Sequence, residues 1–446
     1  MLRSGENGCT DLKGGRQCAI LDLDQGAVSQ SDVSIAACDV KQEAAMVTNS
    51  DRLALRQDRI RQSPVMLRGG FRPFFLGAAS WAVIVLLVWL GFLFRYVSPD
   101  LLANPIAWHR HEMVFGFAGA AMAGFALTAV PNWTGRLPIA GTPLAMLAAF
   151  WAAARILPFV GSWAANVGPF VDGAFYLALA AILGREIAQS RNRNIPVAAG
   201  IALFGFFAAI DGVAQAGLIG VTDLGWRGGY AVIIMMIGLI GGRIIPSFTH
   251  NWLAKHGLKG KLSAQTGRYD LILLALTGVA LLAYLIAAES GAAGWLLMGA
   301  GLGHAIRLMG WQGWRAARDP LVAILHLGYF WLSLGVFLLG WSVLGGVPQV
   351  AALHALGAGA MATMILAVMS RATLGHTGRE LRADGLTVAS YILITIAAVA
   401  RVLAGFSIGD PQFMLAVAGT GWIGAFGLFC IGYGPKLCAP RIDGRP

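Results

Sequence analysis

The chain has 446 residues, of which 57% are hydrophobic and only 12% are charged, and its formal net charge is +11. A soluble domain contains about 45–50% apolar and about 25% charged residues, so this composition excludes a soluble globular protein. The positive charge does not indicate a nucleic-acid partner, because the basic residues lie in alternate loops between apolar runs, as topology signals do.

The N-terminal region differs in character from the rest of the chain. Residues 1–45 are polar and mildly acidic and show no helical periodicity. We interpret residues 1–65 either as a disordered tail or as sequence upstream of a true start at Met46 or Met66. Residues 66–436 are expected to form the transmembrane domain, and residues 437–446 a cytoplasmic tail.

The apolar runs that follow predict an all-α polytopic membrane bundle of about twelve transmembrane helices. A helix of about 20 residues crosses the ~30 Å hydrocarbon layer of a bilayer. The predicted spans are 73–94, 108–131, 140–160, 164–184, 195–219, 228–247, 270–289, 292–310, 321–344, 350–370, 386–405 and 412–434.

The loops between these spans differ strongly in charge. With the N-terminus inside, the inner loops and the C-terminal tail carry sixteen lysines and arginines, whereas the outer loops carry only Arg95 and Arg227. Because basic loops stay in the cytoplasm, this bias predicts a multi-pass protein of the cytoplasmic membrane with both termini inside. The five cysteines show neither a disulfide framework nor a zinc-ligand spacing.

An internal repeat relates the second and third helices to the tenth and eleventh. The stretch from His111 to Thr134-Gly-Arg matches the stretch from His354 to Thr377-Gly-Arg at an offset of 243 residues. The helices that follow match through Ala-Arg-Ile-Leu at 154–157 and Ala-Arg-Val-Leu at 400–403. Pro246-Ser-Phe-Thr after the sixth span is a weaker third copy, which favours an arrangement of three groups of four helices.

Five histidines fall within apolar spans, where ionisable groups usually mark a pathway, a cofactor or a functional pair. They are His109, His111, His304, His326 and His354. His109 and His111 are two residues apart, so a regular helix directs them to different faces. His304 and His326 lie on helices joined by a short inner loop, where the two rings can face each other.

These five histidines are predicted ligands for haem iron or copper, because a neutral imidazole is the commonest protein ligand for both. Two histidines on facing helices would form an axial pair for a haem. His111 shares its helix face with small residues, which suggests that it faces the bundle interior. For each histidine the alternative is a hydrogen-bonded packing residue. His376 is expected in the inner loop after the tenth helix.

Three arginines at membrane depth, Arg155, Arg307 and Arg401, are candidate partners for haem propionates. A guanidinium group binds a carboxylate in fork geometry. Arg155 and Arg401 are related by the repeat and share the predicted depth of the outer histidines, whereas Arg307 lies one turn from an inner one. The alternatives are snorkelling to the lipid headgroups and pairing with Asp172 or Asp211.

Four stretches of the chain resemble the NnrS family, and the resemblance covers residues 66–434. They are Leu67-Arg-Gly-Gly-Phe-Arg-Pro-Phe-Phe75, Trp108-His-Arg-His-Glu-Met113, Thr128-Ala-Val-Pro-Asn-Trp-Thr-Gly135, and the segment from His354 through Met364-Ile-Leu-Ala-Val-Met-Ser-Arg-Ala-Thr-Leu-Gly-His-Thr-Gly378. The resemblance implies a multi-pass cytoplasmic-membrane protein that contains haem and copper and is linked to nitric oxide metabolism and relief of nitrosative stress.

The first functional hypothesis is therefore a haem and copper protein that handles nitric oxide or metal-nitrosyl species and takes electrons from a donor whose identity the sequence leaves open. By analogy, haem–copper oxidases also use twelve spans with haem ligands on helices 2 and 10, although the histidines for a full binuclear centre are missing here. The second hypothesis is a secondary transporter whose membrane histidines relay protons. The third is an assembly protein with packed histidines.

Overall fold

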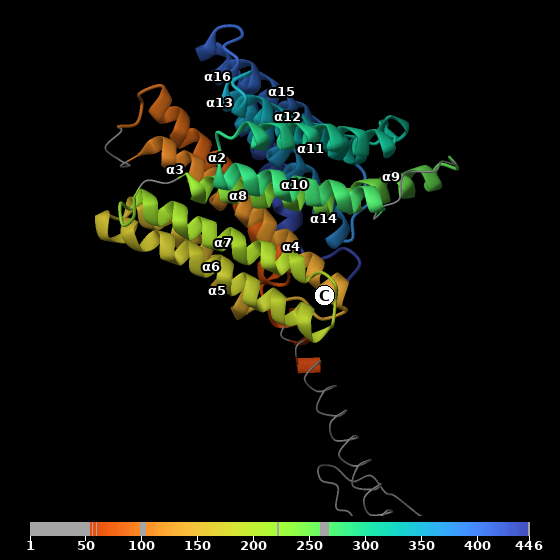
Figure 1. Cartoon of the computed structure of the whole chain (residues 1–446). Helices are drawn as coiled ribbons and strands as arrows, with labels where there is room; N and C mark the ends of the chain where they lie inside the picture. The colour runs from red at the N-terminus through yellow and green to blue at the C-terminus, as the bar shows by residue number, and fades with distance from the viewer. Residues whose placement is uncertain are drawn as a thin grey trace, which may run out of the picture. The chain divides into compact units, whose positions relative to one another are not determined.

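The computed structural model describes residues 60–98, 104–220, 223–258 and 267–444, together with residues 54, 55, 57 and 58. All regular structure in these ranges is helical, as Figure 1 shows, which confirms the predicted all-α class. Residues 1–53, most of the predicted N-terminal tail, lie outside the described residues.

The first six predicted spans each correspond to a helix or to helical segments joined end to end. The segments are η1 (Val65–Leu67), α2 (Phe71–Leu93), α3 (Pro105–His111), η3 (Glu112–Ala118), α4 (Gly119–Thr134), α5 (Thr142–Ile156), η4 (Leu157–Phe159), α6 (Ser162–Gln189), α7 (Ile195–Gln215), α8 (Leu224–Met236), η5 (Ile237–Gly241) and α9 (Gly242–Lys255).

The last six predicted spans are likewise helical in the structure. The segments are α10 (Arg268–Ile286), α11 (Gly291–Gly310), η6 (Gly313–Ala316), α12 (Pro320–Val343), α13 (Gln349–His354), η7 (Ala355–Met361), α14 (Ala362–His376), α15 (Gly385–Gly405) and α16 (Pro411–Cys438). The helix α14 extends to His376, so the prediction that this histidine lies in the following loop was wrong.

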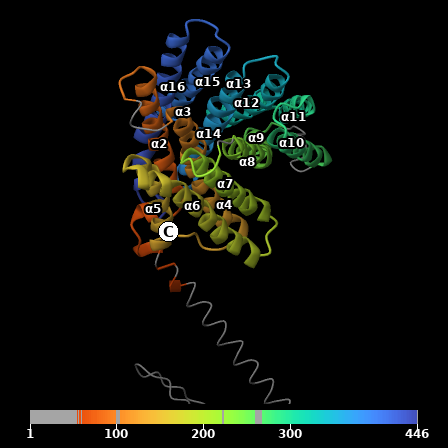
Figure 2. The ribbon, with the colours of Figure 1, turned by 60° about the vertical axis from the view of Figure 1, so that its left-hand side comes forward.

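Within the described residues, eleven helical segments are long and apolar enough to cross a membrane. The one predicted span outside these eleven is the eighth, 292–310, which is the 20-residue helix α11; its many glycines and its His304 and Arg307 reduce its hydropathy. Figures 1 and 2 both show α11 beside α12. The chain is thus a multi-pass helical membrane protein.

Glycines allow α11 and α12 to approach closely along much of their length. A Cβ added to Gly301 would lie 2.6 Å from the backbone nitrogen of Phe337, and one added to Gly340 would lie 2.5 Å from the carbonyl oxygen of Gly294. Small residues at such crossings let helix backbones pack closely in lipid. Because these contacts pair the start of α11 with the end of α12, the two helices run antiparallel side by side.

We use the term rod for helical segments that follow one another end to end within one predicted span. Among the described residues, three rods contain a π-helical segment near the middle. The rods are α3–η3–α4, α8–η5–α9 and α13–η7–α14, and their π segments are Glu112–Ala118, Ile237–Gly241 and Ala355–Met361. They are helices 2, 6 and 10 of the twelve. The structure therefore gives the third, weaker copy of the sequence repeat the same backbone irregularity as the other two. Such π segments occur frequently at functional sites.

Side-chain caps and prolines position several helix starts. Asn104 accepts a hydrogen bond from the backbone nitrogen of Ala107 at 3.0 Å, and Pro105 occupies the first turn of α3. Asp319, Asp384 and Asp410 cap α12, α15 and α16 in the same way, and α12 and α16 also have a proline in the first turn. Each cap satisfies amide groups that no helical carbonyl reaches.

Candidate functional site

A buried network of ionisable side chains joins helices 2, 3, 4 and 5 of the bundle. We define the ion network as His111, Glu112, Arg155, Asp172 and Asp211. Nδ1 of His111 lies 2.9 Å from Oδ2 of Asp211, and Nε2 lies 3.1 Å from Oδ2 of Asp172. Arg155 pairs with Glu112 and with Asp172, at 2.9 Å each. Both nitrogens of His111 are therefore occupied.

Burial makes this network energetically sensitive. Arg155 is 2% exposed, and its two carboxylate partners are each 1% exposed. Unpaired charges at this depth are costly, whereas opposite charges in contact compensate one another. At the periphery, Trp81 donates to Glu112 at 2.8 Å and Gln215 donates to Asp211 at 2.7 Å. The predicted alternative for Arg155, pairing with Asp172, is what the structure shows.

A second group, which we call the outer pair, consists of His109 and His354. They lie in α3 and α13, the first segments of two of the π-containing rods. His109 lies within electrostatic range of His354, and both lie within range of Arg401. The ring of His109 stacks on that of Trp89, with centroids 4.4 Å apart and planes at 16°. As predicted, His109 and His111 therefore face different neighbours.

The outer pair leaves imidazole nitrogens without partners. Nδ1 of His109 is buried, and no hydrogen-bond partner is found for it among the described residues. In His354 the Nδ1–H group donates to the carbonyl of Val350 at 2.8 Å, which leaves Nε2 as the atom with a free lone pair. A backbone carbonyl on one ring nitrogen is a common way to orient a histidine that binds a metal through the other.

The guanidinium group of Arg401 completes this second group. Arg401 lies in α15, is half-buried, and has Tyr230 as a further electrostatic neighbour. The described residues provide it with no carboxylate in an ion pair, in contrast to Arg155, its counterpart in the repeat. The two arginines thus occupy equivalent positions in the sequence repeat but have different neighbours in the structure.

His304 belongs to a separate cluster, in which both of its ring nitrogens are hydrogen-bonded. Its Nδ1 lies 2.8 Å from the hydroxyl of Tyr329, and its Nε2 lies 3.1 Å from the hydroxyl of Thr277. Arg307 pairs with Asp270 at 2.8 Å and also donates to Tyr329 at 2.8 Å. This geometry matches the predicted alternative of a hydrogen-bonded packing histidine.

His326 lies apart from that cluster. Its Nδ1–H donates to the carbonyl of Val322 at 3.1 Å, and Nε2 lies 3.4 Å from the hydroxyl of Thr249. His304 and His326 share none of these partners. The expectation that the two rings face each other finds no support in their contacts.

Sequence reasoning identified the histidines but not most of their partners. Glu112, Asp270 and Tyr329 were not singled out, although each is buried and contacts a predicted site residue. A useful signal was available for the carboxylates, because acidic residues are rare within apolar spans and usually pair with a cation there. In the part of the chain that is described, three or more histidine, cysteine or acidic residues nowhere form a group suited to a metal ion.

The fold and these buried clusters define a polytopic α-helical membrane protein with ionisable groups deep in its bundle. Comparison with known proteins identifies its family. The family described as NnrS protein matches residues 65–441, and the chain belongs to that family. No curated protein matches the chain significantly.

Proposed function

We propose that this protein is a haem- and copper-containing protein of the cytoplasmic membrane that acts in nitric oxide metabolism or in relief of nitrosative stress. Family membership and the multi-span helical bundle support the proposal. The observation that carries it is the outer pair: among the described residues, His109 and His354 each have an imidazole nitrogen with no hydrogen-bond partner, and Arg401 beside them has no ion pair.

The residues present fit a haem. His109 and His354 would hold the haem iron through their imidazole nitrogens, and Arg401 would bind a propionate, because a guanidinium group is well suited to a carboxylate. When bound, the haem would supply one-electron transfer and a binding site for nitric oxide. The protein's part is to orient the two imidazoles through Val350 and Trp89.

The other predicted ligands have a different role in this proposal. His111 and His304 have both ring nitrogens bonded, so ligation by either would require those hydrogen bonds to break. Arg155 and Arg307 already pair with carboxylates. We assign these four residues to the support of the bundle, and we assign no ligand set to copper.

Haem content of single variants tests the proposal. In detergent-purified protein we expect a Soret band and bound iron, and we expect H109A and H354A each to lose most of the haem. H256A is the matched control, because His256 stacks on Trp252 at the end of α9, away from both histidines. Absorption spectra and iron analysis of folded, monodisperse protein provide the measurement.

Two results would contradict this assignment. A colourless wild-type preparation without iron would reject the haem altogether. A normal haem content in both H109A and H354A would reject the outer pair as the ligands and leave His326 as the remaining candidate. Addition of nitric oxide to the reduced protein should shift the Soret band. An unchanged spectrum would mean that the protein binds haem but that this haem does not bind nitric oxide.

A second function, a transporter that relays protons, is favoured by the ion network. His111 lies between two buried aspartates, an arrangement that can pass a proton between carboxylates. Against it, three π-containing rods at intervals of four helices differ from the two halves of six that are common in such transporters. Proton uptake into vesicles containing a metal-free protein would support this alternative.

A further inference from the structure

A cavity of about 490 Å³ opens between the rods α4, α9 and α14, at the end of the bundle where these helices terminate. We call it the basic-end cavity. Its deeper wall is apolar and includes Phe125, Ile244 and Val368. At the mouth are polar side chains, among them Asn132, Arg371 and His376. The volume is that of a site for a small organic molecule or part of a lipid.

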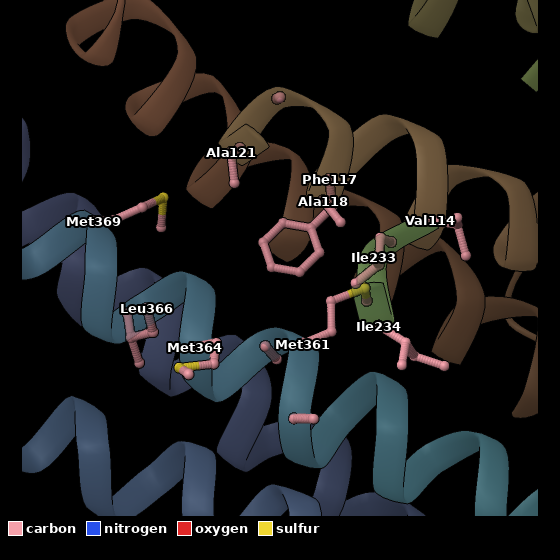
Figure 3. Close-up of a cluster of buried hydrophobic side chains, with 14 of the residues drawn as sticks. Val114, Phe117, Ala118, Ala121, Ile233, Ile234, Met361, Met364, Leu366 and Met369 are labelled. Carbon is pink, nitrogen blue, oxygen red and sulfur yellow. The ribbon is translucent and has the colours of Figure 1, made fainter. Parts of the chain in front are cut away.

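The cavity continues towards the middle of the bundle. A smaller space of about 110 Å³ shares Phe125, Ile244 and Val368 with it and is lined almost entirely by apolar side chains. Figure 3 shows Met361, Met364 and Met369 there, across from Phe117 and the first turns of α4. The two spaces together form an apolar arm that extends inward from a polar mouth.

Two arginines give the mouth a positive charge. Arg371 lies over the ring of Phe248, with its guanidinium carbon 3.9 Å from the ring centroid, and no ion pair or hydrogen bond is found for it within the described ranges. Among the described residues, Arg243 donates to the side-chain oxygen of Asn194, at 2.8 Å, and has no ion pair.

The acidic neighbours do not neutralise this charge. The cavity lining contains no aspartate or glutamate among the described residues. Asp319 acts on Arg371 only through longer-range electrostatics, and its carboxylate accepts from the backbone of Leu321 as the cap of α12. A cationic mouth without a counter-charge, above an apolar arm, is complementary to an anion with a hydrocarbon chain.

From this complementarity we propose that the basic-end cavity binds an anionic phospholipid of the cytoplasmic leaflet. Its phosphate lies at Arg243 and Arg371, and one acyl chain occupies the apolar arm. The positive-inside pattern of the loops places this end of the bundle at the leaflet facing the cytoplasm. Basic pockets between transmembrane helices on that side bind anionic headgroups. The proposal is independent of the haem assignment.

A neutral molecule fits the same cavity less well. A quinone would fill the apolar arm, but it would leave two guanidinium groups without an anion. Phosphate oxygens accept charge-assisted hydrogen bonds from arginine in fork geometry, which a quinone carbonyl cannot match.

Native mass spectrometry of the full chain, exchanged into nanodiscs of phosphatidylglycerol or phosphatidylcholine, tests the proposal. We expect one tightly retained phosphatidylglycerol and no retained phosphatidylcholine. R371Q should lower phosphatidylglycerol retention roughly tenfold, since a hydrogen bond to a charged group is lost. R371K should retain the lipid better than R371Q, because it keeps the charge.

The matched control is R318Q, which removes the same charge from an exposed position at the same end of the bundle. A second variant, A129F, narrows the cavity without changing its charge and should also lower retention. Equal retention of both lipids by the wild type, or equal loss in R371Q and R318Q, would overturn the proposal. A quinone or haem recovered from this cavity in place of the lipid would overturn it as well.

Discussion

At the scale of single residues, His109 and His111 show why a histidine at membrane depth is an incomplete signal. The two are separated by one residue in the same rod, yet His111 contacts Asp172 and Asp211, whereas Nδ1 of His109 has no partner among the described residues. The aspartates come from two other helices, 61 and 100 residues away. Local spacing could predict that the rings diverge, but not which ring would be free to bind a metal.

The ion network leads to a prediction about stability. D172N should destabilise the folded protein by about 3–5 kcal/mol, because it leaves Arg155 and His111 buried without one of their counter-charges. Thermal unfolding in detergent, followed by circular dichroism, measures the effect. D410N is the control, since Asp410 caps α16 at an exposed position and asparagine keeps a capping oxygen there. Equal shifts in the two variants would show that the network is not a stabilising unit.

At the scale of helices, hydropathy predicted the positions of the apolar segments more accurately than it predicted the ends of the helices. The rod α8–η5–α9 continues to Lys255 and α14 to His376, each beyond the predicted span, because polar residues can continue a helix past the apolar layer. The rod that begins at Pro105 starts earlier than predicted because Asn104 caps it. The three π segments could not be predicted from the periodicity of the hydrophobic residues.

The cap of α15 gives a prediction with a pH dependence. Partial burial raises the pKa of Asp384, but hydrogen bonds from Thr387 and the charge of Lys436 outweigh it, so the net pKa is lowered. A carboxyl group with a lowered pKa in the folded state stabilises the protein above its unfolded pKa, and this stabilisation is lost as the pH falls through the folded value.

We therefore expect D384A to cost about 1 kcal/mol near neutral pH, the usual cost of a lost N-cap. The difference from the wild type should shrink as the pH falls below about 4, where the unfolded aspartate begins to protonate. D384N, which retains a capping oxygen, should lose less stability and show a weaker pH dependence. Unfolding midpoints of the three proteins across this range provide the measurement, and a constant D384A effect at every pH would contradict the assignment.

At the scale of the whole molecule, the order and approximate bounds of all twelve helices could be predicted, because apolar length and loop charge are local properties of the sequence. The site was only partly predictable. His354 and Arg401 were identified from their position in apolar spans and their place in the repeat, but their grouping with His109 depends on how helices 2, 10 and 11 pack. The fold thus places two similar His and Arg sets in different environments: carboxylates pair with one set, and no carboxylate among the described residues pairs with the other.

The number of membrane crossings determines on which side of the membrane the C-terminus lies. That number is twelve if α11 crosses the membrane and eleven if it does not. If α11 spans the bilayer, as its antiparallel packing against α12 indicates, Glu289 and Arg318 lie on opposite sides of the membrane. We expect E289C, in a variant whose native cysteines are replaced by serine, to react with a membrane-impermeant maleimide only from outside the cell. R318C should react only in inverted vesicles. Labelling of both from the same side would mean that α11 does not cross, and the two termini would then face opposite compartments.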